Sequence, residues 1–269
     1  MTVLIIAFVL AALYVLSTRC RHGHKGLQAL CGHGYAHRGL HGEGVPENSM
    51  TAFQRAKEGG YGVELDVHLM KDGELAVIHD AKLLRTTGAP GVIEDLTVAD
   101  LPQYKLEGTE ETIPVFSDVL KLFDGKVPII LELKCQDNNY AALCQKACDM
   151  MDNYNGPYCM ESFDPRCIRW LRKNRPDVIR GQLTENYFKG SAAKLPWVLK
   201  FVLVNQILNF LLLPDFIAYR YKDRKHFSNF LTEKLWGCQS VTWTLTAPEQ
   251  YETAVKEGRI PIFEGFLPK

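Results

Sequence analysis

The 269-residue sequence has no excess of charge of either sign, because 31 lysines and arginines balance 31 aspartates and glutamates. Duplex nucleic acid is bound by neutralising many phosphates, so this balance argues against a nucleic-acid partner. The sequence also has no Cys-x-x-Cys pair and no Cys/His spacing typical of zinc, although it contains eight cysteines. We interpret these cysteines as reduced, buried side chains, which favours a reducing compartment.

No charged residue precedes the apolar run at residues 2–16, and the first cations, Arg19, Arg21 and Lys25, follow it. A cleaved secretory signal would carry positive charge before the run. We therefore expect residues 1–18 to form an N-terminal hydrophobic helix that anchors the chain in a membrane as a single pass, with residues 19–32 as a juxtamembrane linker. The positive-inside rule then places the remainder of the chain in the cytoplasm. At ~1.5 Å per residue, the run reaches only ~22 Å of a ~30 Å hydrocarbon core, so the span is marginal.

Beyond the linker, short apolar strand-like runs alternate with helix-like stretches, which is typical of a parallel α/β fold. The candidate strands are residues 34–37, 62–69, 127–134, 158–163, 178–183, 216–221, 240–245 and 260–264. The helix-like segments between them are residues 49–58, 140–153, 165–173, 224–236 and 248–257. This order predicts that residues 33–269 form a (β/α)8 TIM barrel, whose active site lies at the C-terminal ends of the strands. With no helix-length segment after the last strand, we expect another part of the chain to cover that wall.

Two segments do not fit a minimal barrel. Residues 81–118 are expected to form an insertion after the second strand. Residues 195–213 form a second apolar segment, which Lys200 and three amides interrupt. At helical spacing these polar residues share one side and leave a broad apolar face. The segment is therefore either a buried barrel helix, an interfacial helix that contacts a membrane, or a dimer contact.

Charged residues occur inside strands that are otherwise apolar. Glu64 and Asp66 are two residues apart, so both side chains project from one face of their strand. Two adjacent carboxylates repel each other, and a divalent cation is the usual reason to keep them together. Glu132 and Lys134 share one face at the end of the third strand, where unpaired charges would be costly. A metal for Glu132 and a phosphate for Lys134 would remove that cost, although a salt-bridge ladder is an alternative.

The second strand is expected to turn back on itself. Residues 70–74 are turn-like, and residues 75–80 can return as an antiparallel strand. If Met70 lies opposite Leu75, then Asp66 lies opposite His79. This register predicts that His79 lies beside the two carboxylates.

Taken together, these motifs resemble the signature of the glycerophosphodiester phosphodiesterase family. The motifs are Ala36-His37-Arg38-Gly39, Pro46-Glu47-Asn48-Ser49, the run from Val63 to Asp80, Leu131-Glu132-Leu133-Lys134 and Trp243-Thr244. The resemblance spans residues 33–264 and implies a TIM barrel with an insertion after its second strand. The sequence departs from the family pattern at the last strand, where Glu264 is the candidate replacement for a family aspartate.

The resemblance also implies a role for each residue of the motifs. His37 and His79 would be the general acid and base, in an order that the sequence does not decide. Three carboxylates would hold one divalent cation, Mg²⁺ or Ca²⁺: Glu64, Asp66 and Glu132. Four residues would bind the substrate: Arg38 and Lys134 at the phosphate, with Glu47 and Trp243 as weaker candidates.

The function that these roles imply is metal-dependent hydrolysis of a glycerophosphodiester to an alcohol and glycerol 3-phosphate. One alternative is a lysophospholipase D-type lipid phosphodiesterase, which the apolar segments favour. Another is a catalytically inactive membrane-bound binding or scaffold protein. The expected partners are a small-molecule or lysolipid substrate, a membrane and a second copy in a homodimer.

Overall fold

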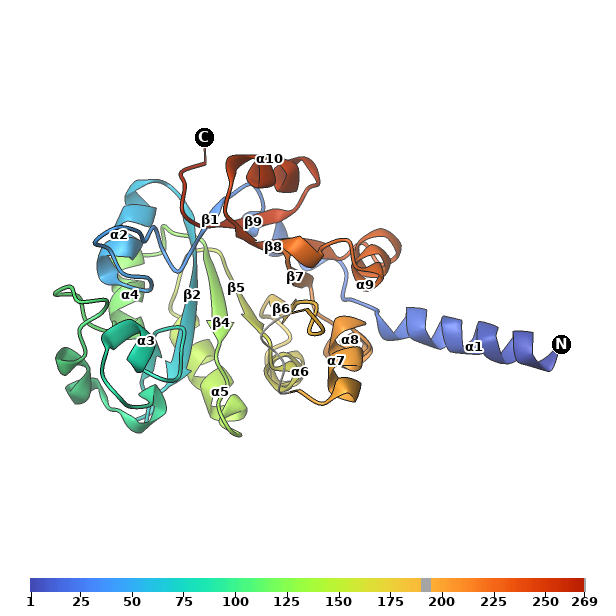
Figure 1. Ribbon diagram of the computed structural model, residues 1–269, viewed down its shortest axis with the longest axis horizontal. Helices are drawn as coiled ribbons and strands as arrows, with labels where there is room; N and C mark the ends of the chain where they lie inside the picture. Colours follow the sequence, from blue (N-terminus) through green and yellow to red (C-terminus); the bar gives the residue numbers. More distant parts are fainter. Residues whose placement is uncertain (190–194, 269) are drawn as a thin grey trace.

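Eight parallel strands close into a barrel in the computed structural model, which describes residues 1–189 and 195–268 (Figure 1). The strands are β1 (Tyr35–His37), β2 (Gly62–Leu69), β4 (Ile129–Leu133), β5 (Tyr158–Ser162), β6 (Arg180–Thr184), β7 (Phe216–Arg220), β8 (Gln239–Leu245) and β9 (Ile260–Phe263). β1 pairs with β2 on one side and β9 on the other, which closes the barrel. The predicted TIM-barrel fold is confirmed, and every strand end lies within two residues of its expected place.

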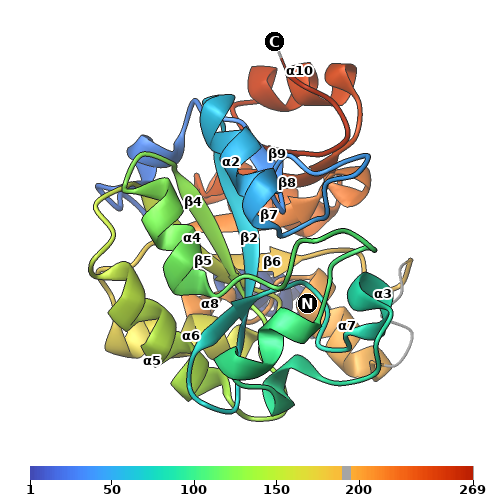
Figure 2. The same cartoon turned by 90° about the vertical axis from the view of Figure 1, so that its left-hand side faces the viewer.

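Helices cover the outside of the barrel, and Figure 2 shows several of them along one side. They are α2 (Met50–Glu58), α4 (Phe116–Phe123), α5 (Tyr140–Met151), α6 (Pro165–Asn174) and α10 (Pro248–Lys256). α2 begins where the Ser49 side chain accepts a hydrogen bond from the backbone N–H of Ala52, and it buries Phe53 and Ala56. α4 was not predicted. It starts at Phe116, inside the range that we expected for the insertion.

The barrel interior changes character along its axis. At the N-terminal end of the strands, Tyr35 and Phe216 fill the interior, and each lies against a glycine of a neighbouring strand. A Cβ on Gly62 would lie 2.7 Å from the Tyr35 ring, and one on Gly181 would lie 2.0 Å from Phe216. Toward the C-terminal end the inward side chains become carboxylates and histidine. The aromatic layer therefore closes one end and leaves the other for chemistry.

The hairpin after β2 has a different register from the expected one. Its return strand β3 (Leu75–Val77) pairs Leu69 with Leu75, and Met70 donates its backbone N–H to Glu74 O at 2.9 Å. Our register placed Met70 opposite Leu75 and was wrong by one residue. Gly73 has a positive φ of 82°, which closes a three-residue loop and sets Glu74 opposite Met70.

The segment after β3 builds a small apolar core of its own over the end of the hairpin. It contains α3 (Leu84–Thr87) and two 3-10 turns, η2 (Ile93–Asp95) and η3 (Val98–Gln103). The buried side chains are Met70, Ala76, Ile78, Leu83, Ile93, Leu101, Leu106 and Ile113. This core fixes the chain around His79, which lies between β3 and α3.

Residues 1–18 form an exposed apolar helix, α1 (Thr2–Ser17), that projects from the barrel (Figure 1). α1 has 16 residues, and no helix in the described part of the chain is long and apolar enough to cross a membrane. The predicted single-pass span is therefore not confirmed. The base of α1 is fixed to the barrel, since Trp236 donates its indole N–H to Val15 O at 3.1 Å. The linker that follows contains a 3-10 turn, η1 (Leu27–Leu30), and Leu30 packs into the N-terminal end of the barrel.

The apolar segment at residues 195–213 is two short helices, α7 (Trp197–Val204) and α8 (Asn209–Leu212). The amides of Gln206 and Asn209 are buried, and Gln206 Nε2 lies 2.6 Å from Asn229 Oδ1. The expected helix at 224–236 is also divided, into α9 (Phe227–Phe230) and a π-helical turn, η5 (Leu231–Leu235), and a separate 3-10 turn, η4 (Tyr221–Asp223), precedes it. The polar side of 195–213 therefore faces the protein, and its apolar side faces outward.

Candidate active site

Three carboxylates meet inside the C-terminal end of the barrel. Glu64 and Asp66 project from β2, and Glu132 projects from β4, where strand register places it beside Asp66. Oxygen atoms of all three lie within 4.8 Å of one another, and all three residues are buried. Burial and the nearby Asp66 carboxylate raise the pKa of Glu64 well above its usual value. Such a cluster of oxygen donors fits a hard divalent cation.

A fourth carboxylate lies beside this cluster, and the sequence reasoning missed it. Glu161 projects from β5 opposite Glu132 and is buried. Its Oε2 atom has no hydrogen-bond partner in the described part of the chain, and burial raises the pKa of Glu161 well above its usual value. Strand alternation in residues 158–162 places Glu161 on the inward face, and that signal was available. A buried carboxylate oxygen without a donor supports a cation at this point of the barrel.

Lys134 balances part of the negative charge. Its ammonium lies 2.7 Å from Glu132 Oε1 and 3.0 Å from Asp66 Oδ1. Burial alone would lower the pKa of Lys134, but the Asp66 and Glu132 carboxylates raise it. Burial alone would also raise the pKa of Asp66, yet Lys134 holds it well below its usual value. Lys134 is therefore a buried, fully charged group at the site.

His37 lies at the end of β1 and faces the carboxylates. Its Nε2 atom lies 3.9 Å from Glu64 Oε2, and its Nδ1 atom lies 2.5 Å from Glu264 Oε2 on the other side. Burial lowers the pKa of His37, against the opposing effect of Glu264. The ring is therefore held between the site and a carboxylate at the end of β9.

His79 reaches the same cavity from the hairpin. Its Nδ1 atom lies 2.6 Å from Asp80 Oδ1, and burial lowers the pKa of His79 to about 4. Burial would raise the pKa of Asp80, but hydrogen bonds from Arg85 and His79 hold it at about 2. Although our hairpin register was wrong, both histidines line one cavity with Glu64 and Glu132. Asp80 and Arg85 were not among the predicted site residues.

The loop after β1 supplies Arg38, whose guanidinium Nε lies 3.5 Å from Asp66 Oδ2. Arg38 and Asn48 have positive φ values of 56° and 52°, and the Asn48 N–H donates to Arg38 O at 2.9 Å. Such backbone strain is typical of functional loops. Glu47 Oε1 accepts hydrogen bonds from Arg38 at 3.0 Å and from Arg85 at 2.6 Å. The structure thus places Glu47 as a partner of two cations at the site.

Trp243, in the C-terminal half of β8, lines the cavity together with Phe163. The two rings meet edge to face, with centroids 5.6 Å apart. They form an apolar wall opposite the charged residues.

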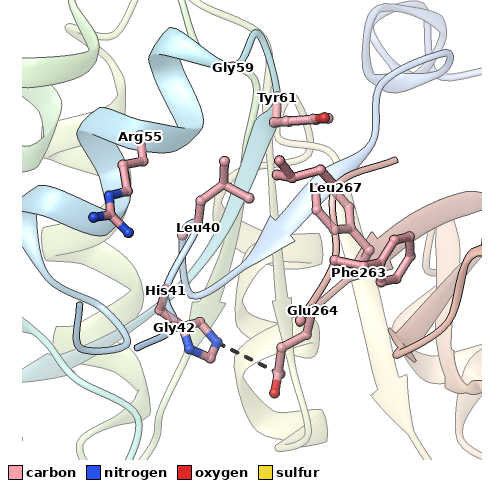
Figure 3. Close-up of a pocket in the computed structure, with 12 residues that line it drawn as sticks. Leu40, His41, Gly42, Arg55, Gly59, Tyr61, Phe263, Glu264 and Leu267 are labelled. Atoms are coloured by element: carbon pink, nitrogen blue, oxygen red, sulfur yellow. Dashed lines mark ion pairs between the residues drawn. The ribbon is translucent and has the colours of Figure 1, made fainter. Parts of the chain in front are cut away.

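A larger groove lies on the outer wall of the barrel, between α2 and the residues after β9, as Figure 3 shows. Glu264 borders this groove, but the carboxylate cluster and His79 do not.

A parallel barrel that gathers carboxylates able to hold a metal ion, two histidines and two cations at one end is typical of a hydrolase of phosphate esters. Comparison with known proteins identifies the family. A sequence model described as the glycerophosphoryl diester phosphodiesterase family matches residues 37–258. The chain belongs to this family, which confirms the resemblance seen in its motifs.

Several relatives show how far the similarity extends. The chain is 30% identical to a glycerophosphodiester phosphodiesterase of Caldanaerobacter subterraneus subsp. tengcongensis, over 83% of this chain and 89% of the relative. It is 38% identical to the Bacillus altitudinis glycerophosphodiester phosphodiesterase over 56% of this chain and 65% of that protein. It is 36% identical to lysophospholipase D GDPD1 of Rattus norvegicus, over 49% of this chain and 45% of that protein. The chain thus spans less than two thirds of the last two.

Solved structures confirm the fold at lower sequence identity. A phosphodiesterase of Oleispira antarctica in complex with the product sn-glycerol-3-phosphate has a TM-score of 0.72 and 20% identity, and the match covers 88% of this chain and 94% of that one. A glycerophosphoryl diester phosphodiesterase structure from Silicibacter pomeroyi also has a TM-score of 0.72, with 20% identity, over 91% of this chain and 95% of that one. Both matches confirm the barrel fold of this chain.

Proposed function

We propose that the protein hydrolyses glycerophosphodiesters to an alcohol and glycerol 3-phosphate, with one divalent cation, Mg²⁺ or Ca²⁺. The observation that carries this proposal is the single cavity lined by His37, His79, Glu64 and Glu132 in a chain of this family. The Oleispira antarctica phosphodiesterase, which shares the fold, is described as a complex with sn-glycerol-3-phosphate as product. The chain also aligns with 89% of the Caldanaerobacter glycerophosphodiester phosphodiesterase.

Glu64, Asp66 and Glu132 would hold the cation through oxygen atoms, with Glu161 beside them. When bound, the cation supplies positive charge at a nonbridging phosphate oxygen. Lys134 and Arg38 are the protein's own cations at this place, and both lie against Asp66. As the phosphate enters, it gives Lys134 an anionic partner outside the carboxylate cluster. The two cations then orient the phosphodiester and stabilise the charge that develops on it.

His37 and His79 move the protons. Each ring has its Nδ1 atom against a carboxylate, so Nε2 is the nitrogen that each ring can present to the substrate. One Nε2 takes the proton of the nucleophile, and the other gives a proton to the leaving alkoxide. The nucleophile is either water or the neighbouring hydroxyl of the glycerol, which would form a cyclic phosphate that water then opens. Both orders of the two histidines are compatible with this geometry.

Product analysis tests this function. Purified protein with Mg²⁺ or Ca²⁺ should release glycerol 3-phosphate from glycerophosphocholine, and His37→Ala should lower turnover by about 10²- to 10⁴-fold. His33→Ala, which changes a histidine at the opposite end of the barrel, is the matched control and should keep wild-type turnover. An undiminished rate for His37→Ala, or no release by the wild-type protein with either ion, would contradict the proposal.

A lysophospholipase D-type activity at a membrane is the second candidate, because a specific surface favours it. We define the apolar flank as the exposed side chains of α7, α8 and α9 around the base of α1. Its members are Trp197, Val198, Phe201, Phe210, Phe227 and Phe230. Phe227 stacks on Tyr14 of α1 with centroids 6.4 Å apart, so the flank continues onto the apolar helix. A surface helix whose apolar side faces outward is typical of contact with lipid.

We therefore propose that α1 and the apolar flank attach the barrel to a lipid surface, while the cytoplasmic side and a homodimer remain predictions from sequence alone. Trp197→Ser with Phe201→Ser should reduce sedimentation with phosphatidylcholine/phosphatidylglycerol vesicles and reduce lysophosphatidylcholine cleavage. Glycerophosphocholine turnover should stay unchanged. Val255→Ser, an exposed apolar residue of α10, is the control. Unchanged vesicle binding in the double variant would remove the support for a lipid-facing flank.

A further inference from the structure

The carboxylate of Glu264 is the nearest partner of His37 outside the cavity. Glu264 follows β9 directly, and its backbone N–H donates to Leu245 O of β8 at 2.9 Å. Its Oε2 atom lies 2.5 Å from His37 Nδ1. The same oxygen lies 3.9 Å from Nε2 of His41, the contact drawn in Figure 3. Glu264 thus joins the last strand of the barrel to the histidine of the first.

The contact between Glu264 and His37 determines which ring nitrogen of His37 faces the substrate. A carboxylate accepts hydrogen bonds, so Nδ1 of His37 carries the hydrogen, and Nε2 faces Glu64 in the cavity. Rotation about its two side-chain bonds gives an imidazole several possible orientations, and the hydrogen bond to Glu264 selects one of them. A turned ring would no longer present Nε2 to the substrate. The position of the proton-transfer atom therefore depends on a residue more than two hundred positions away in sequence.

The second histidine shows the same arrangement from a different source. His79 has its Nδ1 atom 2.6 Å from Asp80, the next residue in the chain. Both rings therefore use Nδ1 for a carboxylate and present Nε2 to the same cavity. The carboxylate that contacts His79 belongs to the next residue in the chain. The carboxylate that contacts His37 reaches it only because β9 pairs with β1 and closes the barrel.

We propose that Glu264 is a positioning residue, which orients His37 and fixes its tautomer through the hydrogen bond at Nδ1. This inference rests on the proposed function, since it assigns the way in which one of the two proton-transfer groups is held. Glu264 itself touches neither the carboxylate cluster nor the cavity. Removing its charge should therefore slow turnover without weakening substrate or cation binding.

The substitution Glu264→Gln tests whether Glu264 positions His37. Glu264→Asp serves as the conservative variant. Glu249→Gln, on the exposed surface of α10, is the matched control. We expect Glu264→Gln to lower kcat by about 10- to 100-fold with KM within about twofold. Glu264→Asp should recover part of that loss, because it keeps the carboxylate with one methylene fewer. The downfield proton resonance of His37 Nδ1–H should be present in the wild-type spectrum and absent in Glu264→Gln, whether or not kcat is measurable.

Several outcomes would overturn the inference. One is a wild-type kcat for Glu264→Gln, and another is an unchanged His37 Nδ1–H resonance. A third is loss of divalent-ion binding in calorimetry, because His37, His41 and Glu264 also lie close enough to share an ion. If the wild-type protein itself releases no glycerol 3-phosphate, the proposed function fails instead, and the resonance still reports on the hydrogen bond.

Discussion

The two sides of the barrel differ in what they bring to the site. Four neighbouring strands, β1, β2, β4 and β5, carry His37, Glu64, Asp66, Glu132 and Glu161, and the segments that follow them add Arg38 and His79. β6 and β8 complete the cavity with Leu183 and Trp243, and the helices outside them carry the apolar flank. One side therefore holds the chemistry and the other holds the surface that we assign to lipid. Substitutions on the charged side should therefore change turnover and stability, whereas substitutions on the apolar side should change vesicle binding.

Removing the cation should have the largest effect on the charged side. Treatment with EDTA should abolish glycerol 3-phosphate release, because Glu64, Asp66 and Glu132 alone present only negative charge to the phosphate. Mg²⁺ or Ca²⁺ should restore the activity, and the assay of each ion separately shows which one serves. Full turnover of rigorously metal-free protein would contradict the role of the carboxylate cluster.

Lys134→Met should have the second-largest effect. It removes a positive charge that we assign to the substrate phosphate and that also pairs with Asp66 and Glu132 in the folded protein. We expect kcat/KM to fall by about 10²-fold or more. In metal-free protein, the change leaves Asp66 and Glu132 buried without their cation, so the free energy of unfolding should drop by about 3–5 kcal/mol. Denaturant unfolding with and without Mg²⁺ measures this. Lys126→Met, at an exposed ion pair, is the control and should change neither quantity.

Glu64→Gln should have the opposite effect on stability. Burial raises the pKa of Glu64 above its value in the unfolded chain, so its favourable contribution is complete below about pH 4.5 and is lost as the pH rises toward the folded-state pKa. In EDTA at pH 7.5, Glu64→Gln should therefore have a higher free energy of unfolding than wild type, because the amide carries no charge to bury beside Asp66. The difference should shrink at pH 4.5. Equal stability at both pH values would show that the cluster is not strained by its charge.

The smallest effect belongs to the apolar side. Trp197 is 72% exposed, so Trp197→Ser should change the free energy of unfolding by no more than about 0.5 kcal/mol. Denaturant unfolding in the absence of lipid measures this, and turnover of glycerophosphocholine should also stay at the wild-type value. A large loss of stability would show that the flank is packed against protein instead of being free for lipid.

The charged side was also the side that the sequence revealed best. Strand alternation alone predicts that Glu64 and Asp66 share a face, and the same rule places Glu161 on the inward face of β5. Glu264 could not be assigned from sequence, because its contact with His37 exists only when β9 pairs with β1. The hairpin register failed because it depends on the loop that Gly73 closes, which spacing alone does not determine.

On the apolar side, sequence gave the composition of the surface but not its shape. The break between α7 and α8, with a positive φ of 56° at Gln206, turned a single expected segment into two helices. Buried hydrogen bonds from Gln206 and Asn209 then decide which side of that segment faces outward. Those partners come from α9 and from within the segment itself, so only the folded chain brings them together. The missed helix α4 is eight residues long and begins inside the range expected for the insertion, where no capping side chain marks its start.

The most direct test of the account is the turnover of His79→Ala with its cation bound. Calorimetry should show one Mg²⁺ or Ca²⁺ bound as in the wild-type protein, because the ion is assigned to carboxylates and not to His79. Glycerol 3-phosphate release at saturating metal should nevertheless be about 10²- to 10⁴-fold slower. Turnover at the wild-type rate, in a variant that binds the ion normally, would contradict the assignment of proton transfer to the two histidines.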